Sequence, residues 1–265
     1  MKVLRWELFK LRAQLRVRAA LAVCLLAPLL LALVLSTQQG LPKDTLFGRH
    51  LHESGFALPL LVLGFAGTWA FPLLTSLVAG DIFAAEDGHG TWPALLTRSR
   101  TRSEVFTGKA LASLLVALTL LVATAVSSLV AGLALAGDRP LVSLSGSSMT
   151  PTHALAVVLL SWASTIPPLL GFTAVAWLLS VISRSTLIAV GGPVLLGLLL
   201  QLLGLVGGLG AGANALLTSP FTAWHGLARG DAYYGPLWQG ALVSLGWAVP
   251  CALAARRVLL RRDIS

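Results

Sequence analysis

Long apolar runs alternate with short polar segments along the whole chain. Six runs are long enough to cross a hydrocarbon core of about 30 Å, which takes roughly 20 residues of helix. Backbone amides cannot stay unpaired in lipid, so each run is predicted to be a helix. The predicted spans are residues 19–37, 56–80, 110–136, 154–182, 186–207 and 234–255. This pattern predicts an all-α polytopic membrane protein with one transmembrane domain over residues 1–265.

A basic amphipathic segment precedes the first span. Its leucines are spaced by four, three and four residues and form one apolar helical face, while its arginines lie elsewhere on the helix. Residues 1–18 are therefore predicted to form an interfacial helix on the inner leaflet. That helix could simply anchor span 1, or it could take part in transmission. Residues 36–39 (STQQ) lack a small-x-small cleavage pattern, so span 1 is predicted to be retained rather than removed as a signal peptide.

The basic residues are unevenly distributed between alternate loops. Fifteen of the 19 Lys and Arg precede span 1, follow span 6, or lie after spans 2 and 4. The other loops hold Lys43, Arg49, Arg139 and Arg229. The positive-inside rule then predicts that both termini are cytoplasmic and that loops 38–55, 137–153 and 208–233 are external. The formal net charge of +9 is assigned to contact with anionic membrane lipids, and no nucleic-acid partner is expected.

Groups capable of chemistry are scarce within the spans. Their central turns contain no Asp, Glu, Lys, Arg or His, although ion-coupled carriers generally need such groups at depth. Gly108-Lys109 lacks the rest of a phosphate-binding loop. His50 and His52 lie in a predicted outer loop, where solvated side chains are expected rather than a metal site. We expect no catalytic residue, cofactor or metal in this chain, and any energy for uphill transport would come from a partner.

Two later segments are predicted to be irregular. Pro167 and Pro168 remove amide donors at mid-depth of span 4 and are predicted to form a helix kink or gating element. Glycines spaced by four in and beyond span 5 favour close helix approach, and spans 4 and 5 are predicted to pack beside spans 1 and 2. In the outer segment 208–233, apolar residues such as Phe221 and Trp224 could dip back into the membrane interface.

The segment between spans 2 and 3 reads EDGHGTWPALLTRSRTRSEVFTGK, residues 86–109. Thr91 can cap a helix, and Trp92, Leu95 and Leu96 share one face of that helix. Ser103 is predicted to cap span 3. The segment thus predicts an amphipathic knob on the cytoplasmic side, whereas an ordinary positive-inside loop would explain only its arginines.

These residues resemble a pattern in the permease subunits of ABC exporters of the ABC-2, or type V, family, which includes bacterial drug and bacteriocin-immunity exporters. The pattern approximates Glu-x-x-x-Gly-Thr, Leu-Leu, Pro-x-x-Arg and then Gly-Lys. This chain supplies Glu86, Gly90-Thr91, Leu95-Leu96, Arg102 and Gly108-Lys109, with Ser99 at the Pro position. Ser219-Pro220-Phe221 and the terminal Arg262-Asp263 extend the resemblance.

The resemblance implies that residues 86–102 form a coupling helix that docks on a separate ATPase subunit. The implied coupling residues are Glu86, Gly90, Thr91, Trp92, Leu95, Leu96, Arg98, Arg100 and Arg102. It also implies two ATPase copies that hold ATP and Mg²⁺, a second permease chain that is identical or related, and a bacterial plasma membrane. The chain itself would be non-catalytic and would export an amphipathic or hydrophobic substrate, such as a drug or antimicrobial peptide. Two alternatives remain: a non-transporting scaffold or sensor, and an intramembrane enzyme or secondary carrier.

Overall fold

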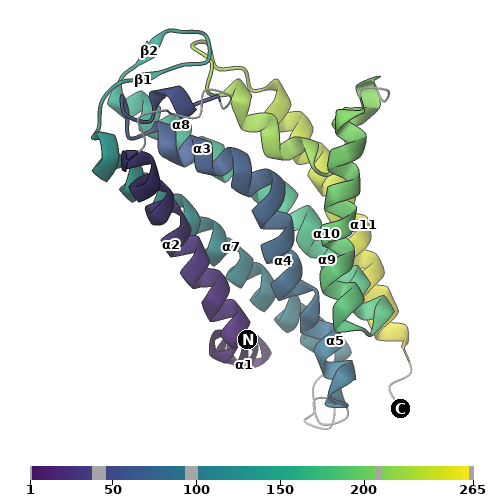
Figure 1. Cartoon of the computed structure of the whole chain (residues 1–265). Coiled ribbons are helices and arrows are strands. Elements are labelled where there is room, and N and C mark those ends of the chain that lie inside the picture. Colours follow the sequence, from purple (N-terminus) through teal and green to yellow (C-terminus); the bar gives the residue numbers. More distant parts are fainter. Residues whose placement is uncertain (1, 38–45, 93–100, 207–209, 263–265) are drawn as a thin grey trace.

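The computed structural model describes residues 2–37, 46–92, 101–206 and 210–262 (Figure 1). This part of the chain holds six helical segments that are long and apolar enough to cross a membrane. They are Leu15–Thr37, Ala57–Gly88, Arg102–Ala136, Pro151–Ser183, Thr186–Leu205 and Gly235–Arg261. The prediction of an all-α polytopic fold is confirmed. The span ends differ most around the polar segment, where helix continues to Gly88 and resumes at Arg102 rather than at residue 110.

The N-terminal segment forms two helices rather than one. Helix α1 (Lys2–Ala13) ends before α2 (Leu15–Thr37), so the predicted interfacial helix over residues 1–18 is too long. α1 packs on α7 (Arg102–Ala136) and buries Leu11, while Trp6 and Phe9 stay exposed. Exposed aromatic side chains on a basic helix suit a position at a membrane surface.

The second span changes helix type at its centre. α3 (Ala57–Phe65) leads into a π-helical segment, η2 (Ala66–Ala70), and then into α4 (Phe71–Ala79) and α5 (Asp81–Gly88). Pro72 has no amide hydrogen to continue the α-helical ladder, which accounts for an irregular turn immediately before it. The hydrophobic pattern of span 2 did not predict this interruption.

Thr101, not Ser103, caps the long helix α7. The Thr101 hydroxyl accepts a hydrogen bond from the Glu104 amide at 3.2 Å, and the Glu104 carboxylate accepts one from the Thr101 amide at 3.2 Å. This reciprocal capping box satisfies two amides that the first helical turn leaves unpaired. The predicted cap at Ser103 was wrong because Ser103 lies inside the first turn.

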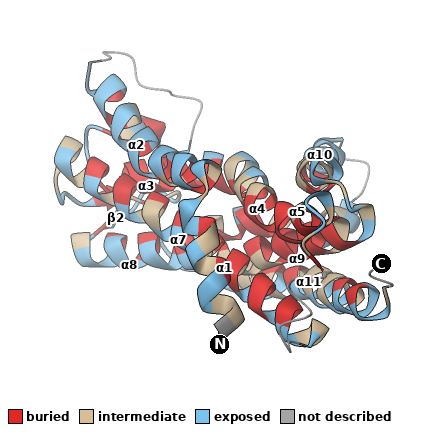
Figure 2. Ribbon diagram, turned by 90° about the horizontal axis from the view of Figure 1, so that it is seen from below, coloured by how far each residue is buried: buried red, intermediate tan, exposed pale blue. Residues whose placement is uncertain are grey.

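The fourth span is interrupted beside the two prolines, where the sequence predicted a kink. α8 (Pro151–Ala163) ends before Ser164, and α9 (Ile166–Ser183) restarts with Pro167 and Pro168 in its first turn, where missing amide donors are tolerated. α9 and α10 (Thr186–Leu205) both pack on α4, whereas the main neighbour of α2 is α7. The predicted packing of spans 4 and 5 against span 2 is therefore confirmed, but their predicted packing against span 1 is wrong (Figures 1 and 2).

A cap of short elements covers one end of the bundle. It contains η1 (Gly48–His50), a hairpin of β1 (Leu141–Val142) and β2 (Ser148–Met149), η3 (Gly210–Ala215) and η4 (Ser219–Gly226). Phe221 and Trp224 of η4 are buried within the protein, so they do not lie at a lipid interface as the sequence suggested. The last helix, α11 (Gly235–Arg261), returns the chain to the end where α1 lies (Figure 1).

The buried residues form two cores, one near each end of the bundle. Figure 2 shows the buried positions on the sides of the helices that face one another. The first joins α3 and α8 to η4. The second lies at the opposite end and joins α1, α5, α7, α9 and the end of α11. In this second core Phe106 stacks on Phe83 with ring centroids 5.3 Å apart and meets the Trp177 ring edge-on. The polar segment between α5 and α7 is thus attached to this second core.

Close backbone contact between α7 and Gly55, just before α3, gives a first prediction. A Cβ on Gly132 would overlap the backbone carbonyl of Gly55. Gly132→Ala should therefore cost about 1–3 kcal/mol through overpacking. Gly246→Ala is the control, because a Cβ there meets open space. Thermal unfolding in detergent should lower Tm only for Gly132→Ala, and equal Tm values for both variants would contradict the close approach.

Candidate functional site

The candidate site lies where α5 ends and α7 begins, at the end of the bundle that holds α1. Gly90 adopts a positive φ of 62°, which lets the chain turn sharply after α5 without strain. The Thr91 hydroxyl donates a hydrogen bond back to the Glu86 carboxylate. Trp92 is 3% exposed and packs in the second core, so it anchors the segment within this chain.

A buried ion-pair cluster, formed by Glu7, Lys10, Glu86 and Lys109, supports this turn. Lys109 is fully buried, and its Nζ lies 2.9 Å from a Glu7 carboxylate oxygen and 2.8 Å from one of Glu86. Lys10, which is partly exposed, places its Nζ 2.5 Å from the same Glu86 oxygen. Two ammonium groups and two carboxylates balance in charge, which makes their burial tolerable. The cluster therefore fastens α1, α5 and α7 to one another.

The Gly108-Lys109 pair has a clear structural role in this cluster. A Cβ at Gly108 would collide with the Val3 side chain, so the glycine lets α1 lie directly on α7. The adjacent lysine can then reach Glu7 on α1. Lys109 was predicted to lie outside span 3, whereas the structure places it inside α7. Glu7 and Lys10 were not predicted to belong to the site, although Glu7 is the one acid in α1 and could have signalled a buried pair.

A second polar contact joins α2 and α10 to α5 at the junction of α4 and α5. Arg16 of α2 forms an ion pair with Asp81, the first residue of α5. The other Asp81 oxygen accepts a hydrogen bond of 2.7 Å from the Thr186 hydroxyl at the start of α10. Asp81 is buried, so its charge depends on these two partners. The contact ties α2 and α10 to the helix that leads into the site.

The far end of the segment is fixed to α11. Arg102 donates hydrogen bonds to the carbonyl oxygens of Leu260, at 3.2 Å, and Arg262. The Arg262 guanidinium in turn pairs with both carboxylate oxygens of Asp87, just before the Gly90 turn. Bidentate contacts between a guanidinium and a carboxylate restrict the orientation of the two groups as well as their distance. These contacts thus connect the end of α5, the start of α7 and the end of α11.

The structure brings together Glu86, Thr91, Trp92 and Arg102 of the predicted coupling residues, with Gly90 at the turn. Leu95, Leu96, Arg98 and Arg100 lie outside the described residues. Pro167 and Pro168 are not part of this site and lie at the start of α9. Within the ranges that the structure describes, no group of three His, Cys, Asp or Glu could hold a metal ion. The site's chemistry is therefore that of charge pairing and packing.

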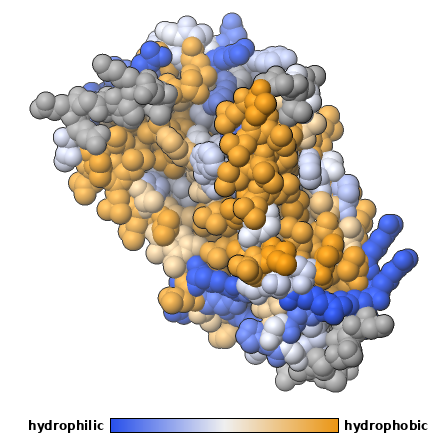
Figure 3. All heavy atoms as spheres, turned by 45° about the vertical axis from the view of Figure 1, so that its right-hand side comes forward, coloured by the Kyte–Doolittle hydropathy of each residue, from blue (hydrophilic) through white to orange (hydrophobic). Residues whose placement is uncertain are grey.

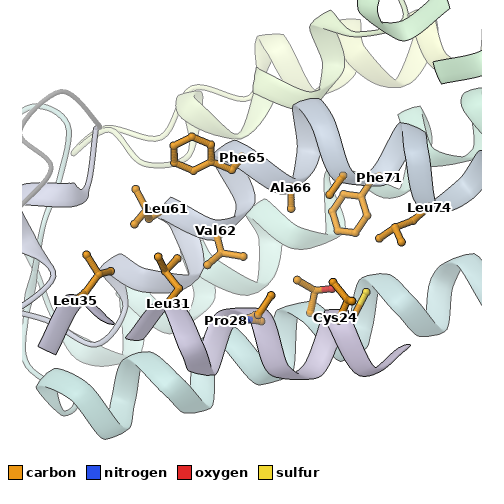
Figure 4. Close-up of a pocket in the computed structure, with 14 residues that line it drawn as sticks. Cys24, Pro28, Leu31, Leu35, Leu61, Val62, Phe65, Ala66, Phe71 and Leu74 are labelled. Atoms are coloured by element: carbon orange, nitrogen blue, oxygen red, sulfur yellow. The ribbon is translucent and has the colours of Figure 1, made fainter. Parts of the chain in front are cut away.

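An apolar groove of about 470 Å³ lies between α2 and the second span (Figure 4). Its walls include Pro28 and Leu31 on α2, and Phe65 and Phe71 on either side of the π-helical segment. Figure 4 shows Cys24, Pro28 and Leu31 of α2 on one side of the gap and Phe71 and Leu74 on the other. The groove thus lies where the backbone of span 2 departs from α-helical geometry, a departure often found at functional positions.

The fold and this site define a multi-pass membrane protein whose membrane helices are joined at one end by charged contacts. A family model described as "ABC-2 family transporter protein" matches residues 3–204, and the chain belongs to this family. Members are generally the non-catalytic transmembrane component of an ABC transporter, which works with an ATPase. A search of curated proteins found no match to the chain.

Proposed function

We propose that this chain is the permease subunit of an ATP-driven exporter. Two ATPase subunits would hold ATP and Mg²⁺, and a second permease chain, identical or related, would complete the transport path. The observation that best supports this role is the buried ion-pair cluster, because Lys109 joins α1 and α5 to α7 immediately beside the segment 86–102. A solvent-exposed basic loop would not need a buried ion-pair cluster to support it.

In this proposal residues 86–102 are the coupling element. ATP-driven closure of the ATPases would push on the segment, and its anchored ends would move as one body. Glu86 would pass the displacement to α1 and α7 through Lys109, and Arg102 would pass it to α11 through the Leu260 carbonyl. Packed, charge-paired elements suit this role because they shift between discrete arrangements instead of deforming gradually.

The apolar groove supports an amphipathic or hydrophobic substrate. Its lining is apolar apart from groups such as the Thr124 hydroxyl, which is bonded at 2.8 Å to the Leu120 carbonyl of its own helix. A site of this kind favours burial of apolar surface and offers no fixed charge to a strongly hydrated solute. Drugs and antimicrobial peptides that partition into membranes fit this description.

Co-purification tests the proposal directly. The chain should be expressed with each candidate nucleotide-binding subunit of the same genome, extracted in a mild detergent, and assayed for a stoichiometric complex. Reconstituted vesicles should then show ATP-dependent movement of a membrane-soluble dye, with ATPase activity stimulated by the permease. Association without transport would instead favour a scaffold or sensor, and failure of any ATPase to associate would refute the coupling role.

The proposed orientation places both termini in the bacterial cytoplasm. In a variant lacking Cys24 and Cys251, a cysteine at Asp138 should react with an impermeant thiol reagent on intact cells. A cysteine at Ser99 should react only after permeabilisation, because it lies on the opposite side by the distribution of basic residues. The reverse pattern of labelling would overturn this topology.

The break in span 4 gives a further prediction. Changing Pro167 and Pro168 to Ala restores amide donors at the start of α9 and should favour a continuous helix through Ser164 and Thr165. Transport should fall several-fold while expression and Tm change little, since the surrounding core is retained. Equal losses of transport and expression would make the prolines folding residues only.

A further inference from the structure

A basic pocket, bounded by Arg184, Arg257, Arg261 and Arg262, lies between the ends of α9 and α11. Its volume is about 550 Å³ and its apolar wall includes Ile182 and Val258. It lies at the same end of the bundle as the coupling segment but on the outside of the helices. Figure 3 shows hydrophilic residues gathered across the lower part of this side, below a broad hydrophobic surface.

Most of the positive charge in this pocket has no acidic partner. Within the part of the chain that the structure describes, Arg184, Arg257 and Arg261 form no ion pair. Arg262 pairs with Asp87, and its buried Nε has no hydrogen-bond partner. Like charges that line one pocket repel one another, and an anion bound between them relieves that repulsion. Arginine side chains match phosphate oxygens well because their donors form a planar fork.

The backbone conformation of Arg184 is a second feature of this pocket that is typical of a binding site. This residue ends α9 with φ 55° and ψ 10°, a left-handed conformation that usually selects glycine. It is the one non-glycine residue with positive φ in the described ranges. Strained positions of this kind cluster at binding sites. A glycine would make this turn without strain. The arginine makes the turn at some cost and adds a long cationic side chain to the lining of the pocket.

An apolar groove continues from the pocket along α11. It is lined by Val249, Pro250, Leu253 and Ala254, and it shares Arg257 and Val258 with the basic pocket. From Val249 to Arg257 the helix rises roughly 12 Å, at about 1.5 Å per residue. Val249 and Leu253 are about half exposed, so this surface is open. Positive charge at one end and a long apolar wall at the other match a phospholipid rather than a small soluble anion.

We propose that this composite surface is a binding site for one anionic phospholipid. Arg184, Arg257 and Arg261 hold the phosphate, and an acyl chain lies along α11 from Val258 toward Val249. Basic pockets between membrane helices on the cytoplasmic side are suited to such headgroups. Arg262 lines the same pocket and also pairs with Asp87. The bound lipid would therefore lie beside the first residues of the coupling segment 86–102.

The test uses purified, delipidated full-length chain in detergent. Binding of phosphatidylglycerol is measured by native mass spectrometry and by the rise in Tm, against phosphatidylcholine with the same acyl chains and against soluble glycerol phosphate. Arg184→Gly combined with Arg257→Gln should weaken phosphatidylglycerol binding at least tenfold. Glycine is favoured at the left-handed position, so Arg184→Gly should fold well. Arg139→Gln, which removes a charge from the exposed loop after α7, is the control.

Three results would overturn the proposal. Equal retention of phosphatidylcholine and phosphatidylglycerol would reduce the site to an apolar groove. Glycerol phosphate binding as tightly as the lipid would show a soluble-anion site. Unchanged lipid affinity in Arg184→Gly with Arg257→Gln would exclude the pocket. Because none of these measurements involves ATP or transport, they are independent of the proposed exporter function.

Discussion

Replacing Lys109 by methionine should cost about 3–5 kcal/mol of folding stability, because it leaves a buried carboxylate without its cation. Lys109 is fully buried and lies within 3 Å of both Glu7 and Glu86. Glu86 would keep Lys10 and Thr91, but Glu7 would lose its ion pair while remaining buried. Unfolding can be followed with a thiol-reactive dye, since Cys24 is free and buried in α2.

Two further variants separate charge pairing from simple packing. Lys10→Met should cost less than about 1 kcal/mol, because Lys10 is 42% exposed and Lys109 still neutralises Glu86. Lys109→Met combined with Glu7→Gln should recover much of the loss, since replacing both charges of a buried pair by neutral groups is often tolerated. A single Lys109→Met variant that melts like the wild type would contradict the buried ion-pair cluster. So would a double variant no more stable than that single one.

The fold was largely predictable because the requirements of a bilayer are local. Any spanning segment must be apolar, about 20 residues long and helical, so the number and type of elements follow from a reading of the sequence. The positions of interruptions were less predictable. Pro167 and Pro168 signalled a disturbance in span 4, whereas Pro72 alone did not reveal the π-helical segment before it. Whether one proline produces a kink, a bulge or a break depends on the neighbouring helices.

The site was only partly predictable because its contacts join distant parts of the chain. The motif from Glu86 to Arg102 was visible as a pattern, but its partners Glu7 and Lys10 come from a helix that must first fold back on α7. The buried position of Trp92 has the same origin, since its neighbours in the second core come from separate helices. Spacing along one helix could place Trp92, Leu95 and Leu96 on a common face, yet it could not show which of them packs inward.

Changing both Leu95 and Leu96 to alanine should abolish transport, if residues 86–102 couple this permease to its ATPase. Both residues lie outside the described residues, so the prediction rests on the sequence pattern and on the anchored ends at Glu86 and Arg102. Trp92 is already buried within the permease, so this prediction assigns the docking role to the two leucines. Truncating such anchors typically costs about 2 kcal/mol or more at an interface, or roughly a 30-fold loss of affinity.

The matched control reverses charge on the same segment and leaves its apolar groups intact. Arg98→Glu with Arg100→Glu should slow association with a charged partner surface and increase its salt dependence, without the same loss once the complex has formed. Membrane insertion and Tm of the permease alone should be unchanged in the leucine variant, because the ion-pair cluster around Lys109 is untouched. Normal stimulation of ATPase activity and full transport by the double leucine variant would refute the docking role. The segment would then be a basic loop, and the ion-pair cluster around Lys109 would serve only to hold α1 against α7.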